Sequence, residues 1–174
     1  MNLTPIPLSF IQQQTSLSWR EALWAYQHKF IGPDHIVKLA QENLSLDSSE
    51  RQFELSSTGK SAEWRILELL EQLATAEVDE LPSSVTKKWL FLILAWIFEN
   101  KDQLCDPLGE VEKIYAEFDY PHEIEKFVRY MPTSDDYHSD QHSYQANTMR
   151  LFKEWKQYLE VAKQNINKIS RPYL

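Results

Sequence analysis

The longest apolar stretch of the chain is Trp89-Leu-Phe-Leu-Ile-Leu-Ala-Trp-Ile-Phe98. Two lysines precede it, and Glu99–Asn100 follows it. A stretch that is apolar on all sides belongs in a protein interior, as a buried helix or as a buried strand. Its length and polar flanks favour a helix at about residues 85–100, surrounded by other helices. The stretch is too short to cross a bilayer, which needs about twenty apolar residues.

Apolar residues recur at spacings of three and four on both sides of this stretch, which is the helical period. The spacing predicts further helices at about residues 19–30, 33–44, 61–76, 106–118, 121–132 and 144–168, with one helical turn near residues 8–11. The apolar face of the 61–76 helix includes Trp64. Residues 45–61 are polar and Ser-rich, so we expect a loop there, with a helical turn or short strand near Gln52–Leu55.

The number of glycines decides between helical and β architectures. The chain has only three, Gly32, Gly59 and Gly109, whereas sandwiches and barrels need many tight turns with positive φ. We therefore predict an all-α fold, with a single domain over residues 1–174. It should be a bundle of roughly six or seven helices around the apolar helix at about residues 85–100.

Composition bounds the class of protein further. Hydrophobic residues make up 43 % of the chain and aromatic residues 13 %, which is enough for a core and excludes wholesale disorder. Cys105 is the only cysteine, which rules out an intrachain disulfide and a cysteine-based metal cluster. No basic residue precedes Arg20, so we expect no secretory signal and a cytoplasmic protein without membrane association.

The net charge of −8 is concentrated in one part of the chain. Residues 99–140 hold 12 acidic and 4 basic residues, whereas residues 141–174 hold 2 acidic and 6 basic residues. An acidic region of this size disfavours nucleic acid as a partner. It favours a basic protein, because opposite charge speeds encounter.

Two histidines are candidate metal ligands. His138 and His142 are four residues apart, so a helix would place both rings on one face. Histidine and carboxylate together are what zinc or iron ligation needs. Three aspartates lie around them: Asp135, Asp136 and Asp140. The richness in serine and aspartate also fits a solvated loop, and no third ligand occurs at a recognisable spacing. A metal-dependent enzyme is therefore one alternative function.

No residue is assigned a catalytic role. Ser57–Lys60 and Ser84–Lys87 match the Ser-x-x-Lys pattern, in which a lysine eases deprotonation of the serine. Two matches in one short chain show how readily chance produces the pattern. Ser84 is better explained as a helix N-cap. The sequence therefore favours a non-enzymatic protein, although it does not exclude an enzyme. We expect no cofactor.

Residues 108–132 combine tyrosines with acidic residues. We expect two amphipathic helices that meet at Asp119–Tyr120–Pro121, with Asp119 capping the second helix. Tyrosines at such a corner can bury their rings and offer large contact area at low entropy cost. The candidate partner-binding residues are Glu112, Tyr115, Glu117, Asp119, Tyr120, Glu123 and Tyr130. A capped corner with no binding role explains the same residues.

Trp24 joins these candidates for a different reason. It falls off the apolar face of its helix, which Trp19, Tyr26 and Phe30 define. An exposed tryptophan is a frequent contact residue.

The same stretch resembles a known family. The segments that carry the resemblance are Val111–Glu112, Ile114–Tyr115, Phe118–Asp119–Tyr120–Pro121 and Tyr130–Met131–Pro132. They are similar to the signature of an uncharacterised bacterial family, domain of unknown function 2247. No established activity comes with that family. Small acidic proteins of this sort often lie beside bacterial polymorphic toxins and act as their immunity proteins, so the resemblance implies a toxin-immunity role.

The leading hypothesis is therefore a protein-binding module, an immunity protein that neutralises a basic toxin domain. Besides the metal-dependent enzyme, a helical scaffold or regulatory subunit is the other alternative. It would use the apolar seam of the C-terminal helix, which consists of Phe152, Trp155, Leu159, Ala162, Ile166 and Ile169.

Overall fold

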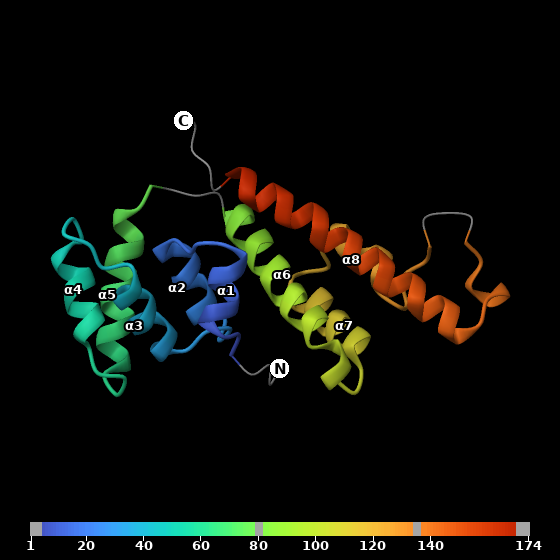
Figure 1. The fold of residues 1–174 in the computed structure, drawn as a ribbon, viewed down its shortest axis with the longest axis horizontal. Coiled ribbons are helices and arrows are strands. Elements are labelled where there is room, and N and C mark those ends of the chain that lie inside the picture. Colours follow the sequence, from blue (N-terminus) through green and yellow to red (C-terminus); the bar gives the residue numbers. More distant parts are fainter. Residues whose placement is uncertain (1–4, 79–81, 134–136, 170–174) are drawn as a thin grey trace. The chain divides into compact units, whose positions relative to one another are not determined.

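A computed structural model describes residues 5–78, 82–133 and 137–169 of the chain, the last three by their backbone only (Figure 1). These residues contain helices and no β-strand, which confirms the all-α prediction. The chain divides into two compact units, Met1–Trp89 (unit 1) and Leu90–Leu174 (unit 2). A single domain over residues 1–174 stays a prediction.

Unit 1 contains five complete α-helices and the start of a sixth. They are α1 (Leu8–Gln14), α2 (Trp19–Gln27), α3 (Pro33–Glu42), α4 (Glu50–Ser57), α5 (Glu63–Ala76) and the first part of α6 (Pro82–Glu99). Helix α2 packs against α5, while α3, α4 and α5 contact one another. A capping box formed by Ser18 and Glu21 opens α2, and Pro33 is the first residue of α3.

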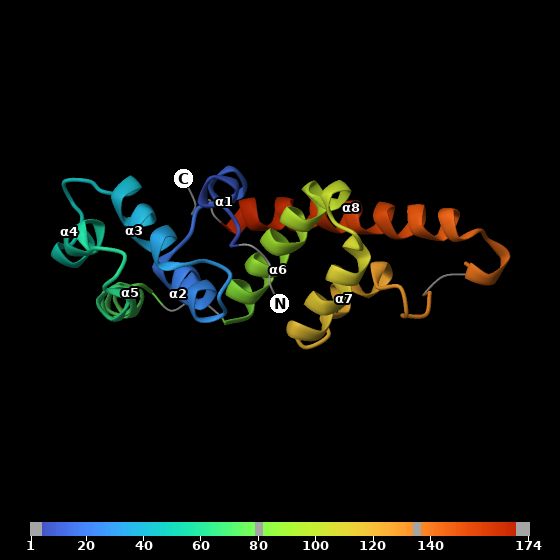
Figure 2. The same cartoon turned by 90° about the horizontal axis from the view of Figure 1, so that it is seen from below.

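Unit 2 contains the rest of α6 and a mixture of α- and 3₁₀-helices. In order they are η1 (Lys101–Gln103), α7 (Pro107–Glu117), η2 (His122–Phe127), η3 (Ser139–Gln141) and α8 (Tyr144–Ile169). Helix α8 packs along η2, which also contacts α7 (Figure 2). The part of the chain that the structure describes thus has eight α-helices and three 3₁₀-helices, against the six or seven helices expected.

Helix α6 is the predicted apolar helix. Every residue from Trp89 to Ala95 is buried, as the unbroken apolar run requires. The helix begins at Pro82, so Ser84 lies in its first turn and is not the N-cap that we expected. Its position at the centre of a bundle stays a prediction. No helix among the described residues is both long and apolar enough to cross a membrane.

The segment 45–61 holds more helix than predicted. Ser49 accepts a hydrogen bond from the N–H of Gln52 at 3.3 Å and thereby caps α4. The buried side chain of Gln52 donates to the carbonyl of Asn43 at 3.0 Å and so holds α4 against the end of α3. Polar contacts of this kind leave no apolar periodicity, which is why the sequence pattern did not reveal the helix.

Trp64 corrects the predicted apolar face of α5. Its side chain is 73 % exposed, whereas Ile66, Leu70 and Leu73 are buried. Trp64 precedes Ile66 by two residues, and two residues on a helix are separated by about 200° around the axis, so the ring points to the opposite side. The tryptophan is thus a surface residue of unit 1.

Candidate functional site

The corner after α7 positions the tyrosines of the candidate site. Asp119 and Tyr120 both have a φ of 58°, in the left-handed region. The N–H of Tyr120 donates to the carbonyl of Tyr115 at 2.8 Å, and that of Asp119 donates to Ala116 at 3.3 Å. These two bonds form a Schellman motif, which closes the helix and reverses the chain direction. Tyr120 is thereby folded back toward the last turn of α7.

The structure corrects the segment that follows this corner. We predicted an α-helix over residues 121–132 with Asp119 as its cap. The observed element is the 3₁₀-helix η2, whose N-cap is Pro121 and which has no side-chain cap. Asp119 instead terminates α7. Ile124 and Phe127 are buried three residues apart, a spacing that one face of a 3₁₀-helix satisfies without a longer α-helix.

Three of the predicted contact residues converge, and we call Tyr115, Tyr120 and Tyr130 the tyrosine cluster. The ring centroids of Tyr115 and Tyr120 are 5.2 Å apart in an edge-to-face arrangement. Those of Tyr115 and Tyr130 are 6.2 Å apart. Tyr115 is buried, whereas Tyr120 and Tyr130 are each 59 % exposed. The cluster thus has a buried base and two exposed rings.

Glu125 and His122, which were not among the predicted contact residues, lie beside the tyrosine cluster. The hydroxyl of Tyr115 donates to Oε1 of Glu125 at 3.1 Å, and Nδ1 of His122 lies 2.7 Å from Oε2 of Glu125. Burial and the bond to Glu125 raise the pKa of Tyr115, so its hydroxyl stays a donor. Glu125 is ten residues from Tyr115 in sequence, and no local pattern links them.

Glu112 belongs to a second group, the arginine clamp, formed by Asp106, Glu112 and Arg129. Nε and Nη2 of Arg129 bind the carboxylate of Glu112 at 2.7 and 3.0 Å. Nη1 and Nη2 bind the carboxylate of Asp106 at 3.0 and 2.9 Å. Both pairs use the planar fork of the guanidinium. Glu112 is therefore engaged within unit 2 and is not a free acid for a partner.

Asp106 also caps α7, directly before Pro107 at the first helical position. Oδ1 of Asp106 accepts the N–H of Gly109 at 3.0 Å. Burial of Asp106 would raise its pKa, but this bond and the Arg129 guanidinium together hold the pKa below its ordinary value. A Cβ on Gly109 would lie 2.4 Å from Oδ2 of Asp106, so the clamp depends on glycine at this position.

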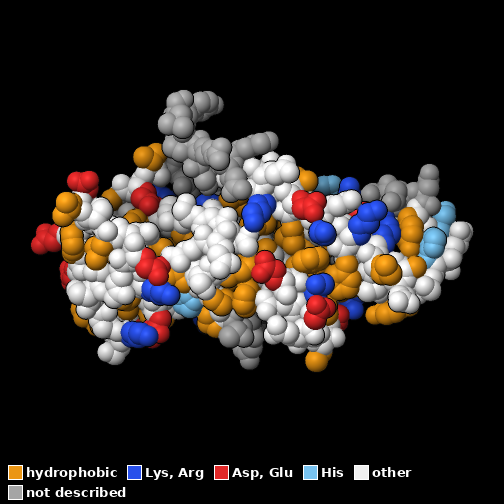
Figure 3. Space-filling model, viewed as in Figure 1, with side chains coloured by type: hydrophobic (Ala, Val, Ile, Leu, Met, Phe, Trp, Pro, Cys, Tyr) orange, Lys and Arg blue, Asp and Glu red, His pale blue; other side chains and the backbone are white. Residues whose placement is uncertain are grey.

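The remaining acidic candidates surround the same corner in sequence. Glu117, Asp119 and Glu123 are exposed, and none forms a salt bridge with a described residue. Burial, and then the negative charge of Glu123, raise the pKa of Tyr158. On the face shown in Figure 3, acidic, basic and hydrophobic side chains alternate, with no large patch of one sign. Charge on that face is therefore local and mixed.

The family model for DUF2247, described as an uncharacterized protein conserved in bacteria, matches residues 8–163. The chain belongs to this family. The match contains the whole 108–132 stretch that suggested it, and also the Trp64 and Glu77 regions of unit 1. Among curated proteins and among solved structures, no match was found.

In this DUF2247 chain, Trp24 does not have the exposed ring on which its selection depended. The ring is half-buried and stacks on His28, with centroids 3.9 Å apart. It also lies 5.8 Å from Phe30 and 6.4 Å from Trp89. Trp24 is part of an aromatic stack in unit 1, and is not a member of the tyrosine cluster of unit 2.

His138 and His142 flank the short helix η3 and do not share an α-helical face. The rings of His142 and Tyr137 stack with their centroids 4.5 Å apart. The Arg150 guanidinium lies 4.3 Å from the centroid of the Tyr137 ring. Among the described residues, no group of three or more His, Cys, Asp or Glu could hold a metal ion. The neighbouring Asp135 and Asp136 lie outside the described residues. The described residues therefore offer no third ligand for a metal ion at His138 and His142.

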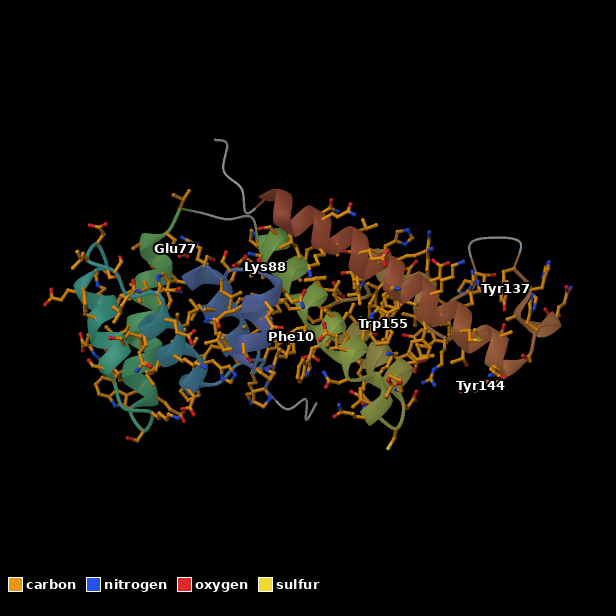
Figure 4. All side chains as sticks on the ribbon, in the orientation of Figure 1. Phe10, Glu77, Lys88, Tyr137, Tyr144 and Trp155 are labelled. Carbon is orange, nitrogen blue, oxygen red and sulfur yellow. The ribbon has the colours of Figure 1, made fainter. Side chains whose placement is uncertain are left out.

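The seam of α8 packs inside unit 2 at Phe152 and Trp155, while the side chain of Ile169 lies outside the described residues. Trp155 is fully buried, its ring 5.9 Å from Phe127 and 5.1 Å from Phe98 (Figure 4). Phe152 stacks at 6.0 Å on Trp155. A scaffold that uses this seam for another protein would have to displace these contacts, so the seam is not a free surface at Phe152 and Trp155.

Proposed function

We propose that this chain is a non-enzymatic protein-binding module, and in particular an immunity protein that neutralises a basic toxin domain in the bacterial cytoplasm. The observation that carries the proposal is the tyrosine cluster. Two half-exposed rings, Tyr120 and Tyr130, rest on a third that is buried and hydrogen-bonded. Aromatic side chains held in this way are typical anchors of protein interfaces.

Rigidity supports this reading. The Schellman motif at Asp119 and Tyr120 sets the backbone of Tyr120. The bond to Glu125 holds the hydroxyl of Tyr115. A side chain that is already ordered loses less conformational entropy when a partner binds it. The Schellman motif therefore serves the binding role as well as the end of α7.

Charge supports the choice of partner. Residues 99–140, which contain the cluster, carry a net charge of −8. Exposed carboxylates at Glu117, Asp119 and Glu123 would attract a basic surface and speed its approach, in a manner that salt weakens. A basic toxin domain has the complementary charge.

The first experiment identifies the partner and tests the protection that an immunity protein must give. The tagged full-length chain is incubated with lysate of its native bacterium at low and at high salt, and the bound proteins are identified by mass spectrometry. The candidate is a basic protein retained at low salt and released at high salt. It is then expressed in a sensitive host with and without this chain.

Restored growth supports the proposal when Tyr120→Ala weakens the protection and Trp64→Ala does not. Trp64 is a matched control because it is an exposed aromatic residue of unit 1, outside the cluster. If no basic protein is retained, or if the retained protein is harmless and unaffected by the chain, the immunity proposal is wrong.

A further inference from the structure

The tyrosine cluster and Glu125 together have the chemistry of a receptor for a planar cation. We propose that the site binds an arginine side chain of the partner, in preference to a lysine. This inference rests on the proposed function, because it names the group that the binding face recognises. Three observations carry it: the open acceptor positions of Glu125, the exposed tyrosine faces, and the engagement of Arg129 elsewhere.

Glu125 is the anionic part of the site. Each of its two oxygens takes one donor within the described chain: Oε1 takes the hydroxyl of Tyr115, and Oε2 takes Nδ1 of His122. A carboxylate oxygen can accept two hydrogen bonds, so one position on each oxygen remains. A guanidinium can donate to both oxygens of one carboxylate, as Arg129 does at Glu112. The Glu125 side chain is 28 % exposed, so it is desolvated in part but still reachable.

The tyrosines are the aromatic part of the site. Tyr120 and Tyr130 both contact the ring of Tyr115, whose hydroxyl reaches Glu125. Tyr115 thus links both exposed rings to the carboxylate through one buried side chain. A guanidinium can stack flat on a tyrosine ring and at the same time donate to a carboxylate in its own plane. An ammonium is compact and strongly hydrated, and it can do only one of these well.

The clamp residue Arg129 does not fill this site. Its guanidinium forms four hydrogen bonds, two to Glu112 and two to Asp106, so its donors are largely engaged there. Lys113 pairs with Glu110 at 2.6 Å. The clamp also shows that this part of the chain binds guanidinium groups through paired carboxylate oxygens. The partner would supply a second such group.

The test compares two probes on the full-length chain. One is an acetylated, amidated peptide with two arginines separated by glycine, and the other is the same peptide with lysines. Binding is measured at low ionic strength by NMR titration, following the ring signals of Tyr120 and Tyr130, assigned through Tyr120→Phe and Tyr130→Phe. We expect the arginine peptide to bind at least about fivefold more tightly than the lysine peptide, the effect of about one stacked contact.

Two variants locate the effect. Glu125→Gln keeps an acceptor for the Tyr115 hydroxyl but removes the charge, and should abolish the preference for arginine. Glu110→Gln removes an equal charge from a residue of α7 that pairs with Lys113, and should leave the preference unchanged. Circular dichroism of each variant checks that the chain is folded.

Equal affinity for the two peptides, or no binding of either, overturns the inference. So does a preference for arginine that survives Glu125→Gln. If the peptides fail but Tyr120→Ala still weakens protection against the toxin, the proposed function stands without the arginine site. If the peptides behave as expected but no toxin is neutralised, the site exists and the immunity proposal is wrong.

Discussion

The carboxylate of Glu77 binds the backbone at the start of α2, where Oε1 accepts the N–H of Trp19 at 2.8 Å. Oε2 accepts the N–H of Arg20 at 2.9 Å (Figure 4). The capping box of Ser18 and Glu21 satisfies the neighbouring backbone groups. The end of α5 is thereby held on the positive end of the α2 dipole, in addition to the packing between the two helices.

Removal of this carboxylate should destabilise unit 1. Glu77→Ala leaves the N–H groups of Trp19 and Arg20 without their acceptors, and we expect a loss of about 1–2 kcal/mol in the free energy of unfolding. Urea denaturation followed by circular dichroism measures it. The control is Glu71→Ala, at an exposed position within α5. It should change the free energy of unfolding by less than about 0.5 kcal/mol. Equal effects of the two substitutions would contradict this role of Glu77.

Lys29 offers a substitution that should stabilise the chain. It has a φ of 63° and ends α2 in a second Schellman motif, in which the N–H of Phe30 donates to Ala25 at 2.9 Å. Glycine has no steric penalty in this conformation, so Lys29→Gly should raise stability by about 0.5–1 kcal/mol. Lys38→Gly, within α3, should lower it by about 1 kcal/mol. The unfolding temperatures of both variants are compared with that of the original chain. A lower unfolding temperature for Lys29→Gly would refute the strain argument.

Gly109 should not tolerate alanine, although alanine usually favours a helix. The new Cβ would lie 2.4 Å from Oδ2 and 2.9 Å from Cγ of Asp106, a side chain pinned by Gly109 and Arg129. The expected cost is about 1 kcal/mol or more, from the lost cap and the disturbed clamp. Gly59→Ala has nothing within 4 Å of the new Cβ and is the comparison. Chemical denaturation that ranks the two variants equally would exclude the clash.

His35 should make unit 1 sensitive to mild acid. Burial, the largest effect, lowers its pKa below the ordinary 6.5, and its Nδ1 accepts the N–H of Gly32 at 3.2 Å. The folded state therefore resists protonation more than the unfolded state does. The contribution of neutral His35 to the free energy of unfolding should be complete above pH 6.5. It should fall as the pH drops from 6.5 toward the folded-state pKa.

The comparison that isolates His35 uses His35→Gln, which removes the titrating group. Urea denaturation of both proteins at several pH values between about 7 and 5 gives the two slopes. We expect a smaller slope in the variant. Parallel slopes would show that other groups cause the loss of stability.

The elements that the sequence predicted well are those in which a start signal and an apolar period agree. The capping box at Ser18, Pro33 and Asp106–Pro107 each marks the first turn of an observed helix. The predictions failed where either the start signal or the apolar period was missing. Helix α4 is held by the polar contacts of Gln52, and η2 has an apolar spacing too short to decide between α and 3₁₀.

The candidate site was predictable only in part, for a related reason. Tyrosines grouped at a proline-marked corner are visible in the sequence, and the structure brings Tyr115, Tyr120 and Tyr130 together. The ionic partners were not visible. Arg129 is 23 residues from Asp106 and 17 from Glu112, and no periodicity connects residues that meet only after the chain has reversed at Asp119.

The central claim is that the tyrosine cluster anchors a protein partner. Its most direct test is the affinity of the full-length chain for the basic protein obtained by salt-sensitive capture, measured by isothermal titration calorimetry. Tyr120→Ala and Tyr130→Ala should each weaken binding by about tenfold or more, whereas Trp64→Ala should change it by less than about twofold. Unchanged affinity in both tyrosine variants, or an equal loss in Trp64→Ala, would contradict the claim.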